Sequence, residues 1–208
     1  MRTAPKSAGI ITAPLMSGII LFLLSMFLYP ALWLETLIFL LSIALSLFFL
    51  VFFRDPERDI PGKGIVSPAD GVVSIVDEID GNKRVAVFMN VHNVHVNRAP
   101  FQGKVLSIRH IDGGYLPAYR KDSDRNERVY TELETDIGRF TIVQIAGALV
   151  RRIVTYANEG DIVDKGQRIG MIRFGSRVDT IMPGSVKVIV REGDRVKAGE
   201  TVIALPTE

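Results

Sequence analysis

Two long apolar stretches without a charged residue lie near the N-terminus, at residues 13–29 and 37–53. A helix needs about 17–25 apolar residues to cross the ~30 Å hydrocarbon core of a bilayer, so each stretch is just long enough. Pro30 and Trp33 lie between them: the proline separates the two helices, and the tryptophan is typical of the membrane interface. The pattern predicts a membrane-associated helical hairpin over residues 1–53.

Basic residues flank both outer ends of this hairpin: Arg2 and Lys6 precede it, and Arg54 and Arg58 follow it. Cytoplasmic segments next to membrane helices carry an excess of Lys and Arg, so both ends are expected at the cytoplasmic face of the cell membrane. A signal peptide would be followed by polar mature sequence, but here a second apolar stretch follows. Buried core helices would show a polar stripe, and these stretches show none. Both alternatives are therefore disfavoured. The sequence allows either a full crossing or a shallow hairpin in one leaflet.

The rest of the chain has the composition of a solvated domain. Cysteine is absent, which excludes disulfides and thiolate chemistry. The net charge of +2 is small and the basic residues are interspersed with acidic ones, so no nucleic-acid partner is expected. A charged segment rich in Pro and Gly predicts a linker at 54–63, followed by one further domain at 64–208.

Short runs of alternating apolar residues, bounded by turn residues, fill this further domain. They predict β-strands at 72–76, 85–89, 103–108, 129–133, 139–145, 153–157, 168–174, 185–190 and 201–205. No stretch here shows helical periodicity over three turns. We therefore expect a mostly β fold with a compact sandwich or barrel-like core.

An internal repeat relates residues 159–169 to residues 192–202, which share the pattern Glu-Gly-Asp-x-Val-x-x-Gly followed three residues later by Ile or Val. The Gly-Asp pair is typical of a tight turn, and the second glycine permits another reversal. Similar hairpin units build the flattened barrels of biotinyl and lipoyl carriers, and the Met-Pro-Gly-Ser-Val run at 182–186 strengthens that likeness. The likeness concerns the scaffold and not the activity.

Three separated patches could supply a nucleophile, a base and an orienting carboxylate: Gly175-Ser176, the pair His92 and His95, and Asp70. A serine hydroxyl can attack the carbonyl of a preceding glycine, which no side chain shields, once a base removes its proton. Imidazole suits the role of base, because its unperturbed pKa of about 6.5 lets it accept and return a proton near neutrality. Taken singly, Gly-Ser and Asp-Gly are more often plain turns.

The two histidines lie in a β-like segment at 89–97. Their spacing of three would place them on opposite faces of a strand, so at most one faces a given pocket. His-x-x-His is a poor metal site in a strand, and neither Cys nor a third His lies close by in sequence. No bound metal is therefore expected.

In this order, after a membrane-like N-terminus, the three patches resemble the proenzymes of the phosphatidylserine decarboxylase family, of the short prokaryotic type. The resemblance runs from about Arg54 to the C-terminus. It implies a relay in which Asp70 orients His95 and His95 activates Ser176, so that the chain cleaves itself after Gly175. The products would be a large chain, 1–175, and a small chain, 176–208, held together as a heterodimer that could assemble further.

The resemblance also implies the reaction. Ser176 would become an N-terminal pyruvoyl group, the cofactor, which forms a Schiff base with the amine of phosphatidylserine in the membrane. Carbon dioxide would leave and phosphatidylethanolamine would be released, with no need for pyridoxal phosphate or a metal. His95 is assigned as the base because residues 95–100, His-Val-Asn-Arg-Ala-Pro, match the histidine motif of the family; His92 is auxiliary or structural.

A polar loop with aromatic residues at 113–128 is the candidate contact with the lipid head group. Its Gly-x-Leu-Pro and Asn-Glu-Arg runs match the family. Tyr115 would lie near the membrane interface, and a basic side chain would bind the phosphate. The candidate basic residues are Arg98, Arg120, Lys121 and Arg177. A solvated loop of mixed charge is an equally good interpretation of the segment.

Two alternatives stay open from the sequence. The first is a membrane-anchored structural adaptor on the biotinyl or lipoyl scaffold; a carrier itself is disfavoured, because no Met-Lys pair occurs in the chain. The second keeps the pyruvoyl chemistry but acts on a related lipid with a serine head group, such as an archaeal ether lipid.

Overall fold

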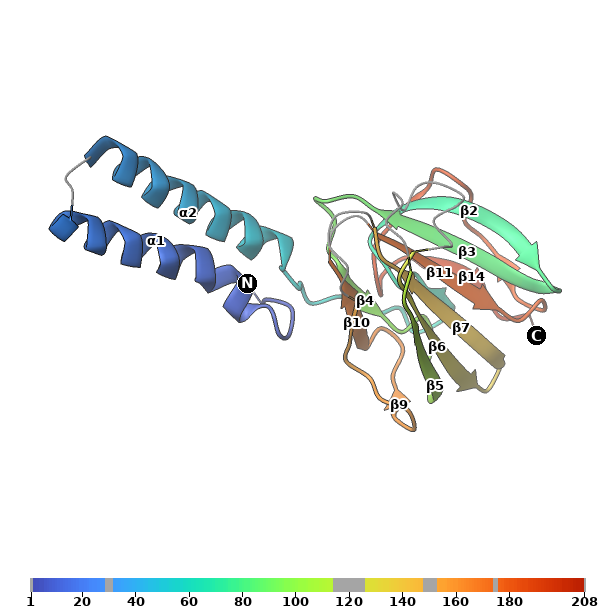
Figure 1. The fold of residues 1–208 in the computed structure, drawn as a ribbon. Helices are drawn as coiled ribbons and strands as arrows, with labels where there is room; N and C mark the ends of the chain where they lie inside the picture. The colour runs from blue at the N-terminus through green and yellow to red at the C-terminus, as the bar shows by residue number, and fades with distance from the viewer. Residues whose placement is uncertain (1, 29–31, 114–125, 148–152, 174–175, 208) are drawn as a thin grey trace. The chain divides into compact units, whose positions relative to one another are not determined.

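A computed structural model describes residues 2–28, 32–113, 126–147, 153–173 and 176–207. The chain forms two compact units, Met1–Pro56 and Glu57–Glu208. Their boundary falls inside the segment predicted as a linker, 54–63. Figure 1 shows a helical hairpin in the first unit and a β fold in the second.

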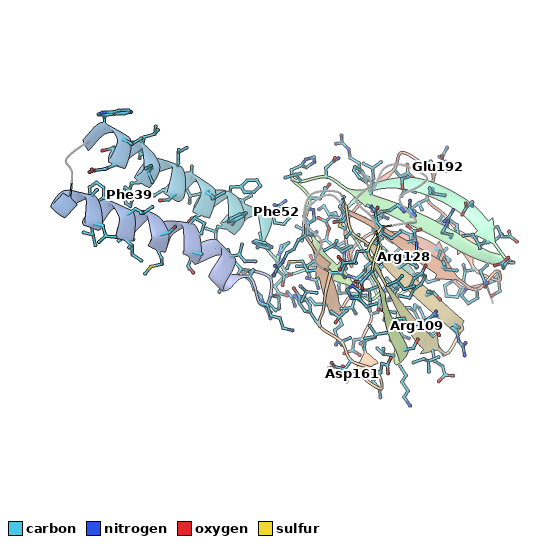
Figure 2. All side chains as sticks on the ribbon, in the orientation of Figure 1. Phe39, Phe52, Arg109, Arg128, Asp161 and Glu192 are labelled. Atoms are coloured by element: carbon cyan, nitrogen blue, oxygen red, sulfur yellow. The ribbon has the colours of Figure 1, made fainter. Side chains whose placement is uncertain are left out.

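The first unit contains helix α1, Ala8–Leu28, and helix α2, Leu32–Phe52. Each has 21 residues, about 31 Å at 1.5 Å per residue, and both are long and apolar enough to cross a bilayer. Phe39 of α2 lies against Phe22 of α1, with ring centroids 5.5 Å apart (Figure 2). The predicted helical hairpin is confirmed.

Backbone hydrogen bonds close the open end of this hairpin. The amide of Ala4 donates to the carbonyl of Phe53 at 2.7 Å, and the amide of Asp55 donates to Arg2 at 2.9 Å. The segments before α1 and after α2 are thus held side by side. Both ends of the hairpin therefore lie at the same end of the helix pair.

The second unit is built from fourteen strands among the described residues, and the predicted mostly β fold is confirmed. The strands are β1 Ile65–Val66, β2 Gly71–Ile79, β3 Asn82–Met89, β4 Val96–Arg98, β5 Gly103–Ile111, β6 Arg128–Thr135, β7 Gly138–Ile145, β8 Ile153–Thr155, β9 Ile162–Val163, β10 Arg168–Ile172, β11 Ser176–Met182, β12 Lys187–Val188, β13 Arg195–Val196 and β14 Val202–Leu205.

Eight of these strands form one curled antiparallel sheet in the order β13-β2-β3-β11-β7-β6-β5-β9 (Figure 1). Two three-stranded sheets, β1-β14-β12 and β4-β10-β8, complete the unit. Apolar side chains from all three sheets form one buried cluster, which includes Phe140, Leu133, Ile172 and Ile203. Burying each such side chain contributes about 1.5–3 kcal/mol, so this cluster is the main source of stability for the unit.

The second unit, the β unit, consists of two structurally equivalent halves. One half comprises β1–β3 with β11–β14, the other comprises β4–β10, and the two meet where β11 pairs with β7. β2 carries a bulge between Val73 and Ile75, and β5 carries the same bulge between Val105 and Ser107. The repeat found in the sequence is therefore part of a duplication that spans the whole unit.

The two copies of the sequence repeat make the same contacts, each within its own half. Figure 2 labels one residue in each copy, Asp161 and Glu192. In the first half, the amide of Gly193 donates to the carbonyl of Val73, and the carboxylate of Glu192 accepts from the amide of Val76. In the second half, the amide of Gly160 donates to the carbonyl of Val105, and the carboxylate of Glu159 accepts from the amide of Ile108. Residues 67–76 thus correspond to 99–108, and residues 159–166 correspond to 192–199.

Two differences from the sequence predictions concern the segments of His95 and Ser176. Residues 89–97 do not form one strand: β3 ends at Met89, and the amide of Asn90 binds the side chain of Asn93 at 2.8 Å, which closes a turn before β4. Asparagine side chains favour such turns over extended strand. The strand β11, which begins at Ser176, is absent from the strands predicted by alternation.

Candidate active site

The candidate site lies at one end of the eight-stranded sheet. Ser176 begins β11 and pairs with Met89, the last residue of β3. β2 runs beside β3 with Val72 opposite Phe88, so Asp70, just before β2, lies at the same end. The fold thus brings two of the predicted residues, far apart in sequence, to one end of neighbouring strands.

Ser176 is completely buried. Among the described residues its Oγ has no hydrogen-bond partner. Most buried polar side chains in folded proteins do have one, so an unsatisfied hydroxyl at this place requires an explanation. Gly175, the predicted residue on the other side of the cleaved bond, lies outside the described residues.

His95 stands directly before β4 and is 1% exposed. Its backbone carbonyl accepts from the amide of Ile172, the last residue of β10, at 3.3 Å. Its ring Nδ1 lies 2.9 Å from the carbonyl oxygen of Asn93. A carbonyl only accepts, so Nδ1 carries the proton and Nε2 is the basic nitrogen of the neutral ring.

Asp70 is held by a different partner from the one predicted. Its two carboxylate oxygens each accept from Nη2 of Arg58 at 2.9 Å, and Oδ1 also accepts from the amide of Ala198 at 2.8 Å. The side chains of Arg58 and Asp70 are only 7% and 12% exposed. The structure does not bring the Asp70 carboxylate into a hydrogen bond with His95.

Arg58 was not predicted as a residue of this site, because it lies in the segment predicted as a linker. An arginine in a charged, Pro-rich segment is normally solvated. Here it also approaches Glu200 at 3.5 Å, which makes a small buried ion cluster with Asp70. An unpaired buried carboxylate is costly, and this demand is the signal that could have pointed to a basic partner.

Two of the predicted phosphate-binding residues are engaged inside the protein. Arg177 donates from Nε and Nη2 to the two carboxylate oxygens of Asp179, at 2.7 and 3.0 Å, and is 3% exposed. Arg98 is buried and donates to the carbonyl of Gly166 at 2.9 Å. These guanidinium groups stabilise the fold where they stand.

The remaining predicted residues are less defined. His92 is exposed in the turn between β3 and β4, close in sequence to the buried His95. Tyr115, Arg120 and Lys121 lie outside the described residues. Among the described residues, no three side chains of His, Cys, Asp or Glu gather in a way that could hold a metal ion.

Sequence reasoning also missed a buried pair of amides beside the site. Gln144 of β7 donates from Nε2 to Oδ1 of Asn97 at 2.8 Å, and both residues are at most 1% exposed. Asn97 stands two residues after His95. Its polar side chain within a strand of buried residues was the available signal.

Comparison with known proteins places the chain. A model of the family described as phosphatidylserine decarboxylase matches residues 45–204. A phosphatidylserine decarboxylase proenzyme of Streptomyces griseus is 53% identical over 161 residues, which cover 77% of this chain and 75% of that protein. One from Thermobifida fusca is 54% identical over 151 residues, covering 72% and 70%.

An archaeal relative is equally similar. A protein of Methanococcoides burtonii named as an archaetidylserine decarboxylase proenzyme is 53% identical over 169 residues, covering 80% of this chain and 79% of that protein. The matches span most of each chain, and they confirm the resemblance drawn from the three separated motifs. The chain belongs to the phosphatidylserine decarboxylase family.

Proposed function

We propose that this chain is a self-processing, pyruvoyl-dependent decarboxylase that converts phosphatidylserine to phosphatidylethanolamine in phospholipid biosynthesis. Family membership and the names of the relatives support the reaction, and favour it over a structural adaptor. Within the chain, the observation that carries the proposal is the buried hydroxyl of Ser176, unsatisfied among the described residues, at the end of the sheet where Asp70 also lies. A serine kept in this state is suited to act as a nucleophile.

Processing begins when Nε2 of His95 takes the hydroxyl proton of Ser176 and Oγ attacks the carbonyl carbon of Gly175. The peptide C–N bond breaks and an ester forms. Loss of the Cα proton of Ser176 then expels the Gly175 carboxylate and leaves a dehydroalanine. Water displaces ammonia from it and leaves a pyruvoyl group at the start of chain 176–208. The tautomer of His95, with Nδ1 donating to Asn93, supports this choice of base.

Asp70 is proposed to stabilise the protonated form of His95, as the carboxylate does in a catalytic triad. In the structure the carboxylate is bound to Arg58 and to the amide of Ala198. A direct contact between Asp70 and His95 would therefore require the Arg58 ion pair to open. Without that change, Asp70 could act only at longer range through its charge.

A pyruvoyl group supplies a carbonyl that binds the amine of the substrate and withdraws the electrons left behind by carbon dioxide. The residues that fit this chemistry are those already named. His95, with its basic Nε2, is the candidate that holds and returns the proton to the substrate carbon. His92, exposed on the preceding turn, is the auxiliary candidate.

The two products of cleavage are proposed to remain together as a heterodimer. The small chain would begin with β11, which lies between β3 and β7 of the large chain and pairs with both. Its β13 pairs with β2, and its β14 pairs with β1. Breaking one peptide bond leaves these strand pairings intact, which supports a stable two-chain enzyme.

The helical hairpin is proposed to anchor the enzyme at the cytoplasmic face of the cell membrane. Its two ends are hydrogen-bonded to each other, and each carries basic residues, Arg2 and Lys6 on one side and Arg54 on the other. Such residues favour the cytoplasmic side. For the lipid phosphate, Arg120 and Lys121 are better candidates than Arg98 and Arg177, whose guanidinium groups are already bound.

A second substrate is favoured by one observation. The relative from Methanococcoides burtonii, named for archaetidylserine, is as similar to this chain as the one from Streptomyces griseus, named for phosphatidylserine. The serine head group is common to both names. The pyruvoyl chemistry acts on that head group, so an ether lipid with the same head group is the alternative substrate.

Both substrates can be tested with the full chain in lipid vesicles. Vesicles that contain serine lipid labelled in the head-group carboxylate, with either acyl or ether chains, would be incubated with the purified protein. We expect labelled carbon dioxide from the acyl lipid and none with the variant Ser176→Ala. Release from the ether lipid alone would assign the alternative, and release from neither would contradict the proposed reaction.

A further inference from the structure

The buried amide pair Asn97 and Gln144 joins β4, the strand that follows His95, to β7, which pairs with the strand that begins at Ser176. Nδ2 of Asn97 points to the sulfur of Met89 at 3.7 Å, and Met89 is the register partner of Ser176. Gln144 is the register partner of Val178, two residues further along β11. The pair thus connects the strand that follows His95 with the neighbours of β11 on both sides, β3 through Met89 and β7 through Gln144.

The surrounding structure makes room for these amides. Gly170 of β10 pairs with Asn97, and a Cβ at position 170 would lie 2.9 Å from Nε2 of Gln144. A methyl group there would push the Gln144 amide out of place. The hydrogen bond of the pair therefore links β4 to β7, and the glycine of β10 that pairs with Asn97 leaves the space that this bond needs.

The duplication shows that the fold does not require amides at these positions. Through the bulged strands β2 and β5 and their register partners, Asn97 corresponds to Ile65, and Gln144 corresponds to Met182. Ile65 and Met182 are both completely buried in the apolar cluster. The same framework is thus built with an apolar pair in one half and with a polar pair in the half that carries His95.

We propose that Asn97 and Gln144 are positioning residues, which hold the strand after His95 against the sheet at the level of Ser176. This inference rests on the proposed function. Asn97 and His95 are two residues apart, so fixing one side chain to β7 and β3 restricts the other. A displacement of about 1 Å at a catalytic group can lower a rate by about a hundredfold, so the pair is expected to matter for processing.

The test replaces the amide pair with the residues found at the equivalent positions of the other half. The double variant Asn97→Ile with Gln144→Met reproduces the apolar pair, and its stability is compared in an uncleavable Ser176→Ala background. We expect thermal unfolding of that full-length precursor within a few degrees of the parent. With Ser176 intact, we expect the same double variant to cleave itself about tenfold to a hundredfold more slowly than the wild type.

Two further variants separate positioning from a general loss of polar groups. Thr180→Val removes a buried hydroxyl from β11, the strand of Ser176. This hydroxyl has no hydrogen-bond partner among the described residues, and its removal should leave the cleavage rate unchanged. The exchange variant Asn97→Gln with Gln144→Asn keeps two amides and their combined length. It should cleave faster than the apolar pair.

The outcomes are distinguishable. If the wild type itself does not cleave, the proposed function fails. If the wild type cleaves, three results would each overturn the positioning role alone: a wild-type cleavage rate in the apolar double variant, a precursor of that variant that does not fold, or an exchange variant no faster than the apolar one. Slow cleavage in a stable apolar variant, with rescue by the exchange, would support it.

Discussion

The two halves of the β unit share a framework but differ at one end. In the half formed by β4–β10, strands β6 and β7 are joined by a tight turn, where Thr135 pairs with Gly138. In the other half the equivalent pair is Met89 and Ser176, and no direct turn joins β3 to β11. The candidate site thus occupies the position that a hairpin turn fills in the other half.

Comparing the two halves separates the residues that build the fold from those that could carry chemistry. The features common to both halves are the strand bulges, the positive-φ glycines of the repeated turns (Gly160 with Gly193 and Gly166 with Gly199) and the glutamates that accept from strand amides. They occur in both halves, so they are assigned to the fold. The features present once are Ser176, His95, the Asp70 ion pair and the amides of Asn97 and Gln144. These single features are the ones we connect with chemistry.

The largest effect is expected at Ser176, where β3 and β11 are not joined by a turn. Ser176→Ala should abolish cleavage and decarboxylation while the β unit stays folded, because the variant removes only a hydroxyl without a described partner. Gly138→Ala, at the equivalent position, should cleave normally but lose stability, since Gly138 has a φ of 118° and a Cβ there would lie 2.8 Å from Pro183. Gel analysis and thermal unfolding of both variants would check the contrast.

The next effect concerns Asp70 and its equivalent, Gln102, which is exposed. Asp70→Asn leaves the buried Arg58 without its bidentate carboxylate, and breaking a buried pair costs about 3–5 kcal/mol. Gln102→Ala should change the free energy of unfolding by less than about 0.5 kcal/mol, as is usual on a surface. Denaturant unfolding of the Ser176→Ala precursor would measure both.

A second variant separates stability from chemistry at Asp70. Removing both charges, with Arg58→Met and Asp70→Asn together, should regain most of the lost stability. If Asp70 also serves His95, cleavage by this double variant should stay slow. A return to the wild-type cleavage rate would assign Asp70 to the fold alone.

A smaller and equal effect is expected at the two repeated turns. Gly160 and Gly193 have φ values of 88° and 93°, and no atom lies within 4 Å of a Cβ at either position. Alanine at either place should therefore cost only the strain of the left-handed conformation, roughly 1–2 kcal/mol. Unfolding measurements on the two single variants should agree closely, and a large difference would show that the halves are not equivalent in stability.

The smallest effect is electrostatic. The hydrogen bond from Arg84 lowers the pKa of Asp77, whereas the equivalent position in the other half is Arg109. Because the folded-state pKa is the lower one, this contribution is present above the unfolded pKa and is lost as the pH falls through the folded value. Asp77→Asn should make the acid branch of the stability curve slightly flatter, and Arg109→Gln should leave that branch nearly unchanged.

The sequence predicted the class of fold because its signals were local. Charge-free stretches gave the hairpin, alternation gave most strands, and Glu-Gly-Asp gave the repeated turns. Strand β11 was missed because Arg177 and Asp179 look like surface residues. Inside the sheet they neutralise each other, a pairing that alternation does not reveal.

The site was less accessible to sequence reasoning. Its serine, histidine and aspartate were found through family motifs. Arg58, which binds Asp70, and Gln144, which binds Asn97 beside His95, come from distant segments. Nothing local marks Gln144 on β7 as the partner of Asn97. Such contacts depend on strand order and register, which a single sequence does not specify.

In the proposed processing, the backbone breaks before Ser176 and leaves a ketone at the new N-terminus. The intact masses of the purified full-length protein test it directly. We predict two chains, 1–175 and 176–208, with the smaller lighter by one ammonia than a chain that begins with serine. A single uncleaved chain that still decarboxylates the lipid, or an active enzyme whose small chain keeps its serine, would contradict self-processing to a pyruvoyl group.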